Sequence, residues 1–181
     1  MAIKYIFTDL GDLSGQADSF IKVNSEEKQF EFFSGTVTNS VMHRCAVNKS
    51  ADQSISSNTW TALTFNQEKY DVGNMHDNST NNTRITIKEA GEYKINYHIK
   101  YESDDEVIFE SKIKKNGSTD IDGTCDTEGG SEDASYGTLQ NHSFLITFAV
   151  DDYLELYFYQ DNGGAKDVLS ANTFFEVYRV Y

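Results

Sequence analysis

Polar and apolar residues alternate between Glu92 and Ile99, where the sequence reads EYKINYHI. Every second residue, beginning with Tyr93, is aromatic or aliphatic, and the residues between them are charged or polar. A period of two residues is typical of a β-strand with one face in a core and the other in water. The glycine at position 91 supplies a turn just before it. The pattern therefore predicts a strand over residues 93–101.

Similar segments recur along most of the chain and are separated by clusters of Gly, Asn, Asp and Ser. The expected strands are residues 41–47, 60–65, 83–87, 93–101, 107–115, 136–150, 153–159 and 174–181. Their spacing is typical of an antiparallel β-sandwich, and no segment with a helical period competes with it. The longest segment, 136–150, is expected to bend or to begin as a loop. The sequence thus predicts an all-β fold.

Two connections between these strands have distinct sequence signals. The pair Asn116-Gly117 follows a basic strand, and Asn-Gly is the strongest short signal for a β-hairpin. Residues 120–135 are acidic and rich in glycine, so we interpret them as a mobile loop. The chain contains no proline, which leaves its turns to Gly, Asn, Asp and Ser.

Two expected strands, 153–159 and 174–181, carry apolar side chains on both faces. A lone sandwich buries only one face of each sheet, so a second apolar face predicts contact with another subunit. The competing interpretation is an aromatic face that stays exposed, because tyrosine tolerates water. The side chains expected at a subunit interface are Tyr97, Tyr101, Tyr153, Tyr157, Tyr159, Phe174 and Tyr178.

Residues 1–38 differ from the rest and are expected to form a segment of their own before a domain over residues 39–181. A turn-rich block is followed by two short apolar runs that predict a small hairpin. A hairpin of this size cannot bury its own apolar side chains, so we expect it to dock on a larger structure. The side chains expected to anchor it are Leu10, Leu13, Phe20, Ile21, Val23, Phe30 and Phe33.

The charge of the chain bears on its partners. The 181 residues carry a formal net charge of −14, which argues against nucleic-acid binding because phosphates require clustered Lys and Arg. The first residues hold only a very short apolar run, so we expect neither a signal peptide nor membrane insertion, and synthesis in the cytoplasm. Cys45 and Cys125 lack the spacing of a zinc site, and their pairing is left open.

The sequence offers no recognisable catalytic motif. Gly11-Asp12-Leu13-Ser14 has the wrong order for an esterase motif and lacks a strand–turn–helix context. The four histidines are scattered. Acidic clusters could supply oxygen ligands to calcium, but none has EF-hand spacing, and charged loops are usually solvated. These clusters are Asp104-Asp105-Glu106, Asp120 with Asp122, Glu132-Asp133 and Asp151-Asp152. We expect no catalytic residue and no cofactor, with calcium as a minor alternative.

The order of the strand segments resembles the C1q/TNF-like jelly roll, in particular its bacterial and phage branch. The matching segments are TRITIKEAGEY at 83–93, KIKKNG at 112–117, residues 144–156, the closing strand 174–180 and an upstream stretch over 56–71. Asp151 stands where the family usually has glycine. The resemblance covers residues 41–181. It implies a ten-strand-type jelly-roll sandwich that forms trimers and binds surfaces rather than catalysing a reaction; some members hold calcium.

The N-terminal segment is similar to short repeats near the bases of phage fibre proteins. The similarity rests on LGDLS at 10–14, DSFIKVN at 18–24 and KQF at 28–30. Phe30 takes the place of a tryptophan, and the usual proline is missing. This likeness implies a segment that anchors a globular head to a larger structure or begins a short fibre.

Together these features favour a non-enzymatic phage virion protein, a homotrimeric knob on a short anchor. It would decorate the capsid as a head fibre or tip a tail fibre, at the virion surface. Expected partners are two further copies of the chain, other virion proteins and, through loops 74–82 and 120–135, a host glycan or protein. The alternatives are a C1q-like cell-surface recognition module and a carbohydrate-active β-sandwich enzyme, which would need paired carboxylates in one cleft.

Overall fold

The computed structural model describes residues 42–103, 107–122, 124, 126–129, 136–140 and 144–180, together with two strands nearer the N-terminus. The chain divides into two compact units, Met1–Ser40 and Val41–Tyr181. The boundary lies two residues from the one expected from sequence. The anchoring role of the first unit stays a prediction.

Within the first unit, β1 (Ser19–Val23) and β2 (Phe30–Ser34) pair antiparallel, which confirms the small hairpin. Their register sets Phe20 opposite Phe33. Five of the seven expected anchor residues, Phe20, Ile21, Val23, Phe30 and Phe33, therefore lie on these two strands. The other two, Leu10 and Leu13, lie outside the described residues.

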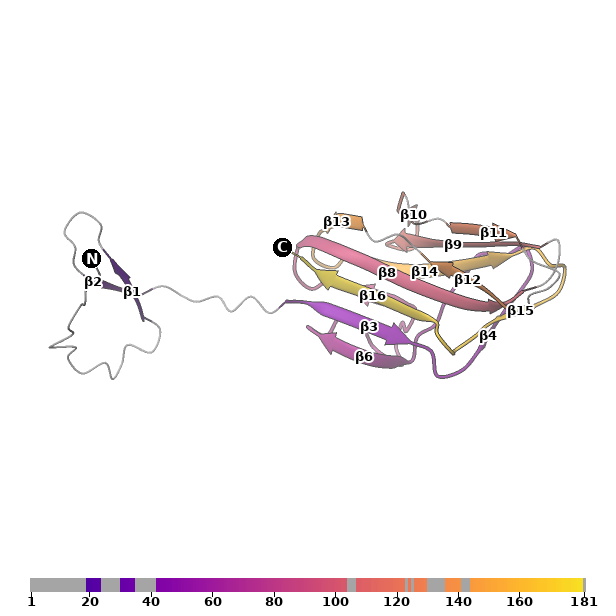
Figure 1. The fold of residues 1–181 in the computed structure, drawn as a ribbon, viewed down its shortest axis with the longest axis horizontal. Coiled ribbons are helices and arrows are strands. Elements are labelled where there is room, and N and C mark those ends of the chain that lie inside the picture. The colour runs from indigo at the N-terminus through magenta and orange to yellow at the C-terminus, as the bar shows by residue number, and fades with distance from the viewer. Residues whose placement is uncertain are drawn as a thin grey trace, which may run out of the picture. The chain divides into compact units, whose positions relative to one another are not determined.

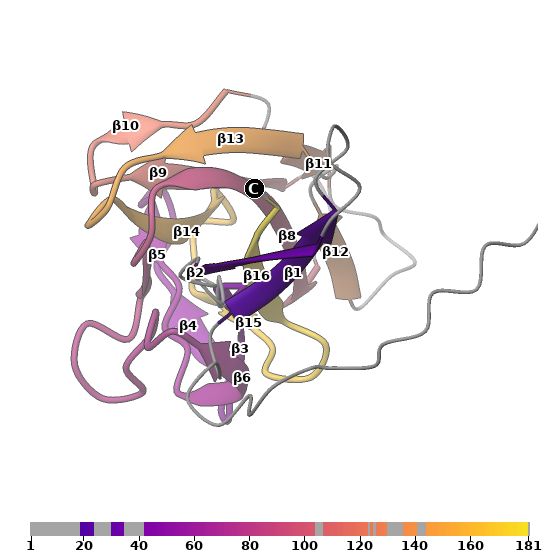
Figure 2. The same ribbon diagram turned by 90° about the vertical axis from the view of Figure 1, so that its left-hand side faces the viewer.

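The second unit is a sandwich of two antiparallel sheets (Figures 1 and 2). The larger sheet contains β3 (Arg44–Asn48), β4 (Gln53–Ile55), β6 (Gln67–Val72), β8 (Gly91–Glu102), β12 (Tyr136–Gln140), β13 (Phe144–Phe148), β15 (Lys166–Val168) and β16 (Phe174–Arg179). Its order is β4-β15-β8-β16-β3-β6, and β12 and β13 both pair with β8. The expected all-β sandwich is confirmed.

The smaller sheet contains β5 (Thr61–Ala62), β7 (Arg84–Thr86), β9 (Ile108–Lys115), β10 (Thr119–Asp120), β11 (Asp126–Gly129) and β14 (Tyr153–Gln160). Its order is β10-β9-β14-β5, with β11 paired to β9 and β7 paired to β14. The long pairing between β9 and β14 therefore forms the centre of this sheet, and it fixes which side chains of the two strands share a face.

The core between the sheets is built by the alternation seen in the sequence. Tyr93, Ile95, Tyr97, Ile99 and Tyr101 of β8 are each at most 2% exposed, while the residues between them face outward. Rings from both sheets meet across the core. The ring centroids of Tyr101 and Phe109 are 4.2 Å apart, and those of Tyr101 and Phe158 are 5.3 Å apart. Such aromatic packing contributes both apolar burial and favourable ring geometry.

Two tight turns follow from residues that accept a left-handed backbone. Asn116 and Gly117 have φ values of 53° and 71°, which suits a type I′ turn and connects β9 to β10. The expected Asn-Gly hairpin is thus confirmed. Asp151, before β14, has a φ of 67°. This conformation explains why the resembling family usually has glycine there, because glycine adopts it without strain.

Several strand boundaries differ from the expectation. The segment 136–150 divides into β12 and β13, which pair with successive parts of β8. The interpretation of 120–135 as a loop throughout is wrong, because Asp126–Gly129 forms β11 on the edge of β9. Strands β4, β6, β10 and β15 were also missed. They are short or largely polar, and the pairing of a neighbouring strand, rather than their own apolar pattern, holds them in place.

Candidate interaction surfaces

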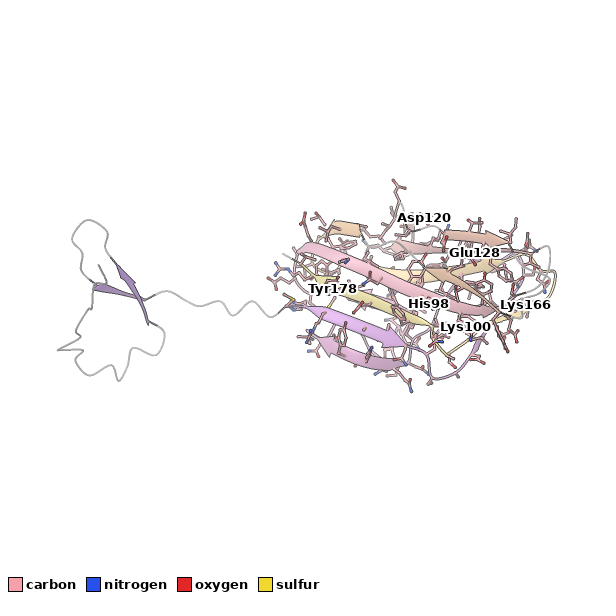
Figure 3. All side chains as sticks on the ribbon, viewed as in Figure 1. His98, Lys100, Asp120, Glu128, Lys166 and Tyr178 are labelled. Atoms are coloured by element: carbon pink, nitrogen blue, oxygen red, sulfur yellow. The ribbon has the colours of Figure 1, made fainter. Side chains whose placement is uncertain are left out.

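The sandwich presents two outer faces that differ in their side chains. We call the outer surface of the larger sheet the β8 face and that of the smaller sheet the β14 face. Figure 3 shows His98, Lys100 and Tyr178 along the larger sheet, whereas Asp120 and Glu128 belong to strands of the smaller one.

The β8 face is a grid in which rings and cations lie side by side. One row sets Lys94 between Leu145 and Tyr178, and Tyr178 in turn lies opposite Arg44. The Nζ atom of Lys94 lies 5.8 Å from the centre of the Tyr178 ring. Cations placed over rings in this way are weakly attracted to them and cover part of the ring from water.

Three large apolar side chains of the β8 face remain well exposed. Tyr136 is 54% exposed, Leu145 is 52% exposed and Phe174 is 40% exposed. Phe174 lies opposite His98, and their rings stack at 6.1 Å with an interplanar angle of 12°. Exposed apolar side chains gathered on one sheet are typical of a contact surface.

The centre of the β8 face holds a carboxylate with two donors. Tyr70 donates its hydroxyl hydrogen to one oxygen of Glu176, and Asn96 donates to the other over 2.9 Å. Partial burial, with the hydrogen bond to Glu176, raises the pKa of Tyr70 to about 12. The tyrosine therefore remains a donor at physiological pH and satisfies the glutamate within the sheet.

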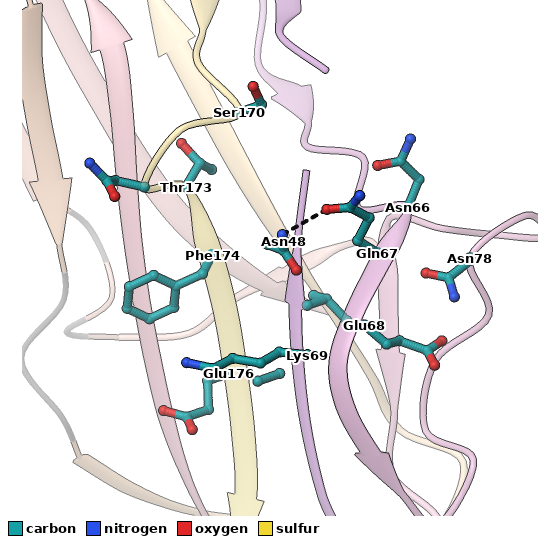
Figure 4. A pocket seen from close by; sticks show the side chains of 13 residues that line it. Asn48, Asn66, Gln67, Glu68, Lys69, Asn78, Ser170, Thr173, Phe174 and Glu176 are labelled. Atoms are coloured by element: carbon teal, nitrogen blue, oxygen red, sulfur yellow. Dashed lines mark hydrogen bonds between the residues drawn. The ribbon is translucent and has the colours of Figure 1, made fainter. Parts of the chain in front are cut away.

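A groove of about 840 Å³ lies beside Phe174, over strands β3, β6 and β16 (Figure 4). Side-chain amides dominate its lining. Asn48, Asn66, Gln67, Asn78 and Asn172 all contribute to it. Glu68 and Glu176 also line it, but Figure 4 shows their carboxylates pointing away from each other. The groove therefore lacks the facing pair of carboxylates that glycoside hydrolysis requires.

The β14 face carries a line of aromatic rings with cations over them. Trp60 and Tyr159 lie with ring centroids 5.3 Å apart, and the Nζ of Lys112 lies 4.1 Å from the centre of the Trp60 ring. Further along β14, Lys114 lies over Tyr157 at 4.8 Å. Each ring is only partly exposed. Carboxylates share this face, since Glu110 lies opposite Tyr159 and Glu155 opposite Lys114. The face thus combines aromatic surface with charges of both signs.

A smaller pocket of about 520 Å³ lies where this line of rings ends at Tyr153. Arg84 lies over the Tyr153 ring at 4.1 Å, and Lys88 lines the pocket opposite the 74–81 segment. His76 also lines it, but burial lowers the pKa of its imidazole, which favours the neutral ring. The positive charge of the pocket therefore comes from Arg84 and Lys88.

The structure separates the residues expected at a subunit interface. Phe174 and Tyr178 lie on the β8 face, but Tyr153, Tyr157 and Tyr159 lie on the β14 face. Tyr97 and Tyr101, which were also expected at the interface, are instead buried in the core of the single chain.

The two buried tyrosines are held there by specific partners. The Tyr97 hydroxyl bonds Ser111 at 2.8 Å and donates to the carbonyl oxygen of Thr124. Tyr101 reaches Glu128, and burial raises its pKa. The polar tip of each ring is thus satisfied inside the sandwich. Sequence reasoning also missed Tyr136, Leu145 and Trp60; the lone tryptophan was a signal that could have been weighed.

Among the described residues, no group of three or more His, Cys, Asp or Glu side chains could hold a metal ion. Two of the acidic residues considered for calcium are engaged elsewhere. Asp120 pairs with Lys112 at 2.8 Å and Asp152 with Lys115 at 2.6 Å. Cys45 is a free, buried thiol whose pKa is raised by burial. Cys125 lies outside the described residues.

Lys49 is a buried cation beside β3, only 4% exposed. Its ammonium group donates to Gln53 Oε1 over 2.7 Å and to the Thr64 carbonyl oxygen over 2.9 Å. Burial lowers its pKa from 10.5 to about 8, partly opposed by Asp52. The charged form is therefore less stable in the folded protein than in the unfolded chain.

This shift predicts a stability that increases with pH. Between about pH 8 and 10 the unfolded chain holds the Lys49 proton more tightly than the folded one, so deprotonation favours folding. The scale is about 1.4 kcal/mol for each pKa unit. We expect the free energy of unfolding of the wild-type chain to rise over this interval relative to Lys49→Met, measured by urea denaturation. Parallel pH curves for the two proteins would contradict the lowered pKa.

The two-sheet arrangement matches known structures. Murine APRIL at pH 8.0 and at pH 5.0 superposes with TM-scores of 0.57 and 0.56, at 10% and 12% sequence identity. In both cases the match covers 77% of this chain and 99% of that chain. The fold is a TNF-like jelly roll. Eiger TNF from S. frugiperda gives a TM-score of 0.52 at 11% identity, covering 78% of this chain and 94% of that chain.

No protein-family model matches the chain, and no curated protein matches it in sequence. Across the described residues, no helix is long and apolar enough to cross a membrane.

Proposed function

We propose that the chain is a non-enzymatic virion protein of a phage, a homotrimeric jelly-roll knob on a short N-terminal anchor. The observation that carries the proposal is the exposed apolar surface of the β8 face, built on a TNF-like sandwich. The phage origin is supported by the sequence likeness of residues 10–30 to fibre-base repeats. The knob would decorate the capsid as a head fibre or tip a tail fibre.

The β8 face is a better trimer contact than the β14 face. Tyr136, Leu145 and Phe174 each expose at least 40% of their surface on it. Removing this area from water supplies roughly 25 cal/mol per Å². On the β14 face the rings of Trp60 and the tyrosines are only partly exposed, and Ile108 is the large apolar residue of its described strands that is comparably exposed. Phe174 and Tyr178 are therefore assigned to the interface.

A cellular recognition module remains the second candidate. The structures that the jelly roll matches include murine APRIL and Eiger TNF from S. frugiperda. Such a module would share the trimeric sandwich and differ in where the protein is found. An enzymatic role has less support, because the amide-rich groove lacks facing carboxylates and the TNF-like fold is typically non-enzymatic.

Immunogold labelling of purified phage particles tests the virion role. Antibodies raised against the full chain are expected to label particles at the capsid surface or at a fibre tip, and particles from a strain lacking the gene are expected to remain unlabelled. Label confined to host cell surfaces, with clean particles, would contradict the virion role and favour the cellular module.

A further inference from the structure

We propose that the β14 face and the pocket at its end bind a linear acidic polysaccharide. This inference rests on the proposed function, because it names the ligand class of a knob that touches a host surface. It follows from three features of the described residues: a line of rings along one strand, cations placed among them, and a cationic pocket where the line ends.

The rings form a platform of suitable shape for a chain of sugars. Tyr153, Tyr157 and Tyr159 project from the same side of β14, with Glu155 between the first two. Trp60, just before β5, packs beside Tyr159. Six strand residues span about 20 Å, which is long enough for several sugar units. Sugar rings present apolar C–H faces that pack against aromatic rings, while their hydroxyls find polar partners at the edge.

The cations give the platform a preference for acidic sugars. Lys112 and Arg84 pair with Asp120 at 2.8 Å and with Glu155 at 3.3 Å. Lys114 lies over Tyr157, opposite Glu155 on β14 and Asp120 on β10, but it forms an ion pair with neither of them in the described part of the chain. An acidic sugar stacked on Tyr157 would therefore meet the Lys114 ammonium group.

The pocket beside Tyr153 would extend the preference for acidic sugars to that end of the line of rings. Arg84 and Lys88 flank its 520 Å³, and Asp77 also lines it. Asp77 keeps its negative charge, because hydrogen bonds from the backbone of Thr80 and Ser79 lower its pKa, and these bonds occupy its Oδ1 atom. A sugar carboxylate entering beside Tyr153 would thus meet Lys88 and the hydroxyl and amide groups of the pocket, while Arg84 is shared with Glu155.

The same features argue against a nucleic acid as the ligand. Phosphate chains need several cations in register to bind a protein of net charge −14. On this face two of the cations are already paired with carboxylates, so the positive charge is sparse. A uronate chain also offers apolar sugar faces that pack on the aromatic rings, whereas the phosphate backbone of a nucleic acid depends on charge alone.

Titration calorimetry on the full chain tests the inference with polygalacturonate and alginate as probes. Fully methyl-esterified polygalacturonate provides a matched neutral ligand, and oligo-dT provides a nucleic acid. We expect at least one acidic polysaccharide to bind, more weakly as salt is raised, and the esterified form to bind at least about tenfold more weakly, a difference of about 1.4 kcal/mol. Lys114→Gln and Trp60→Ala should each weaken binding by about tenfold or more.

Lys69→Gln, on the exposed edge strand β6, is the matched control, and it should leave affinity unchanged. Failure of both polysaccharides to bind, equal binding of the esterified form or oligo-dT, or unchanged affinity in both β14-face variants would each overturn the inference. Light scattering on every sample distinguishes a failure to bind polysaccharide from a failure to form the proposed trimeric knob. A trimer that ignores acidic polysaccharides leaves the knob intact, whereas a monomer contradicts it whatever it binds.

Discussion

Phe174→Glu is expected to convert the trimer into monomers at micromolar concentration. Phe174 is 40% exposed in the single chain, so the substitution should leave the fold intact. At the proposed interface it would bury three uncompensated carboxylates, and an unpaired buried charge costs roughly 3–5 kcal/mol. Light scattering should report a mass near 20.5 kDa in place of three times that value.

Ile108→Glu is the matched control for this substitution. Ile108 is an exposed apolar residue of similar accessibility, 46%, but it lies on β9 in the opposite sheet. It should remain trimeric and fold as the wild-type chain does. Dissociation by Ile108→Glu with no effect from Phe174→Glu would move the interface to the β14 face, and would also remove the proposed polysaccharide platform from the surface.

Phe158→Ala is expected to lower the free energy of unfolding by roughly 3–5 kcal/mol. Phe158 is fully buried, and its ring centroid lies 5.3 Å from that of Tyr101 and 6.2 Å from that of Phe109. Removing the ring loses apolar burial and leaves a cavity where strands from both sheets meet. Urea denaturation at one fixed protein concentration measures the effect, since the stability of an oligomer depends on concentration.

Tyr159→Ala, one residue further along β14, is the matched control that compares a surface ring with the core ring of Phe158. The Tyr159 side chain faces outward, where it stacks on Trp60 and donates to Asn58 over 3.2 Å. Its loss should cost about 1 kcal/mol or less beyond the effect of a surface substitution. Equal losses for the two variants would mean that alternation along β14 does not decide which ring is in the core.

The sandwich was predictable because its longest strands carry strong patterns. Tyr93 and Ile95 alternate with Glu92 and Lys94 in a way that only a half-buried strand explains, and Asn116-Gly117 fixed a hairpin. The short edge strand β6 was not predictable, because QEKYDV is mostly polar and its pairing with β3 depends on distant residues. The hydrophobic pattern of a strand reflects the side chains that the strand buries, and an edge strand buries few of them.

The interaction surfaces were less predictable for a related reason. Alternation tells which residues share a face, but it does not tell which sheet a strand joins. The outward rings of Tyr157 and Tyr178 were expected together and lie on opposite sides of the sandwich. Tyr97 is a different case: it alternates with the polar residues of β8 alongside Ile95 and Ile99, so its own pattern favours the core over the interface that was expected for it.

The solution mass of the wild-type protein, measured by light scattering on the full chain and on residues 41–181, is the most direct test of a trimeric knob. We expect three times the chain mass for both, 20.5 kDa being the mass of one full chain. That result would place the contact within the jelly roll. A monomer in both samples would contradict the knob, and the exposed Tyr136, Leu145 and Phe174 would then belong to a contact with a different partner.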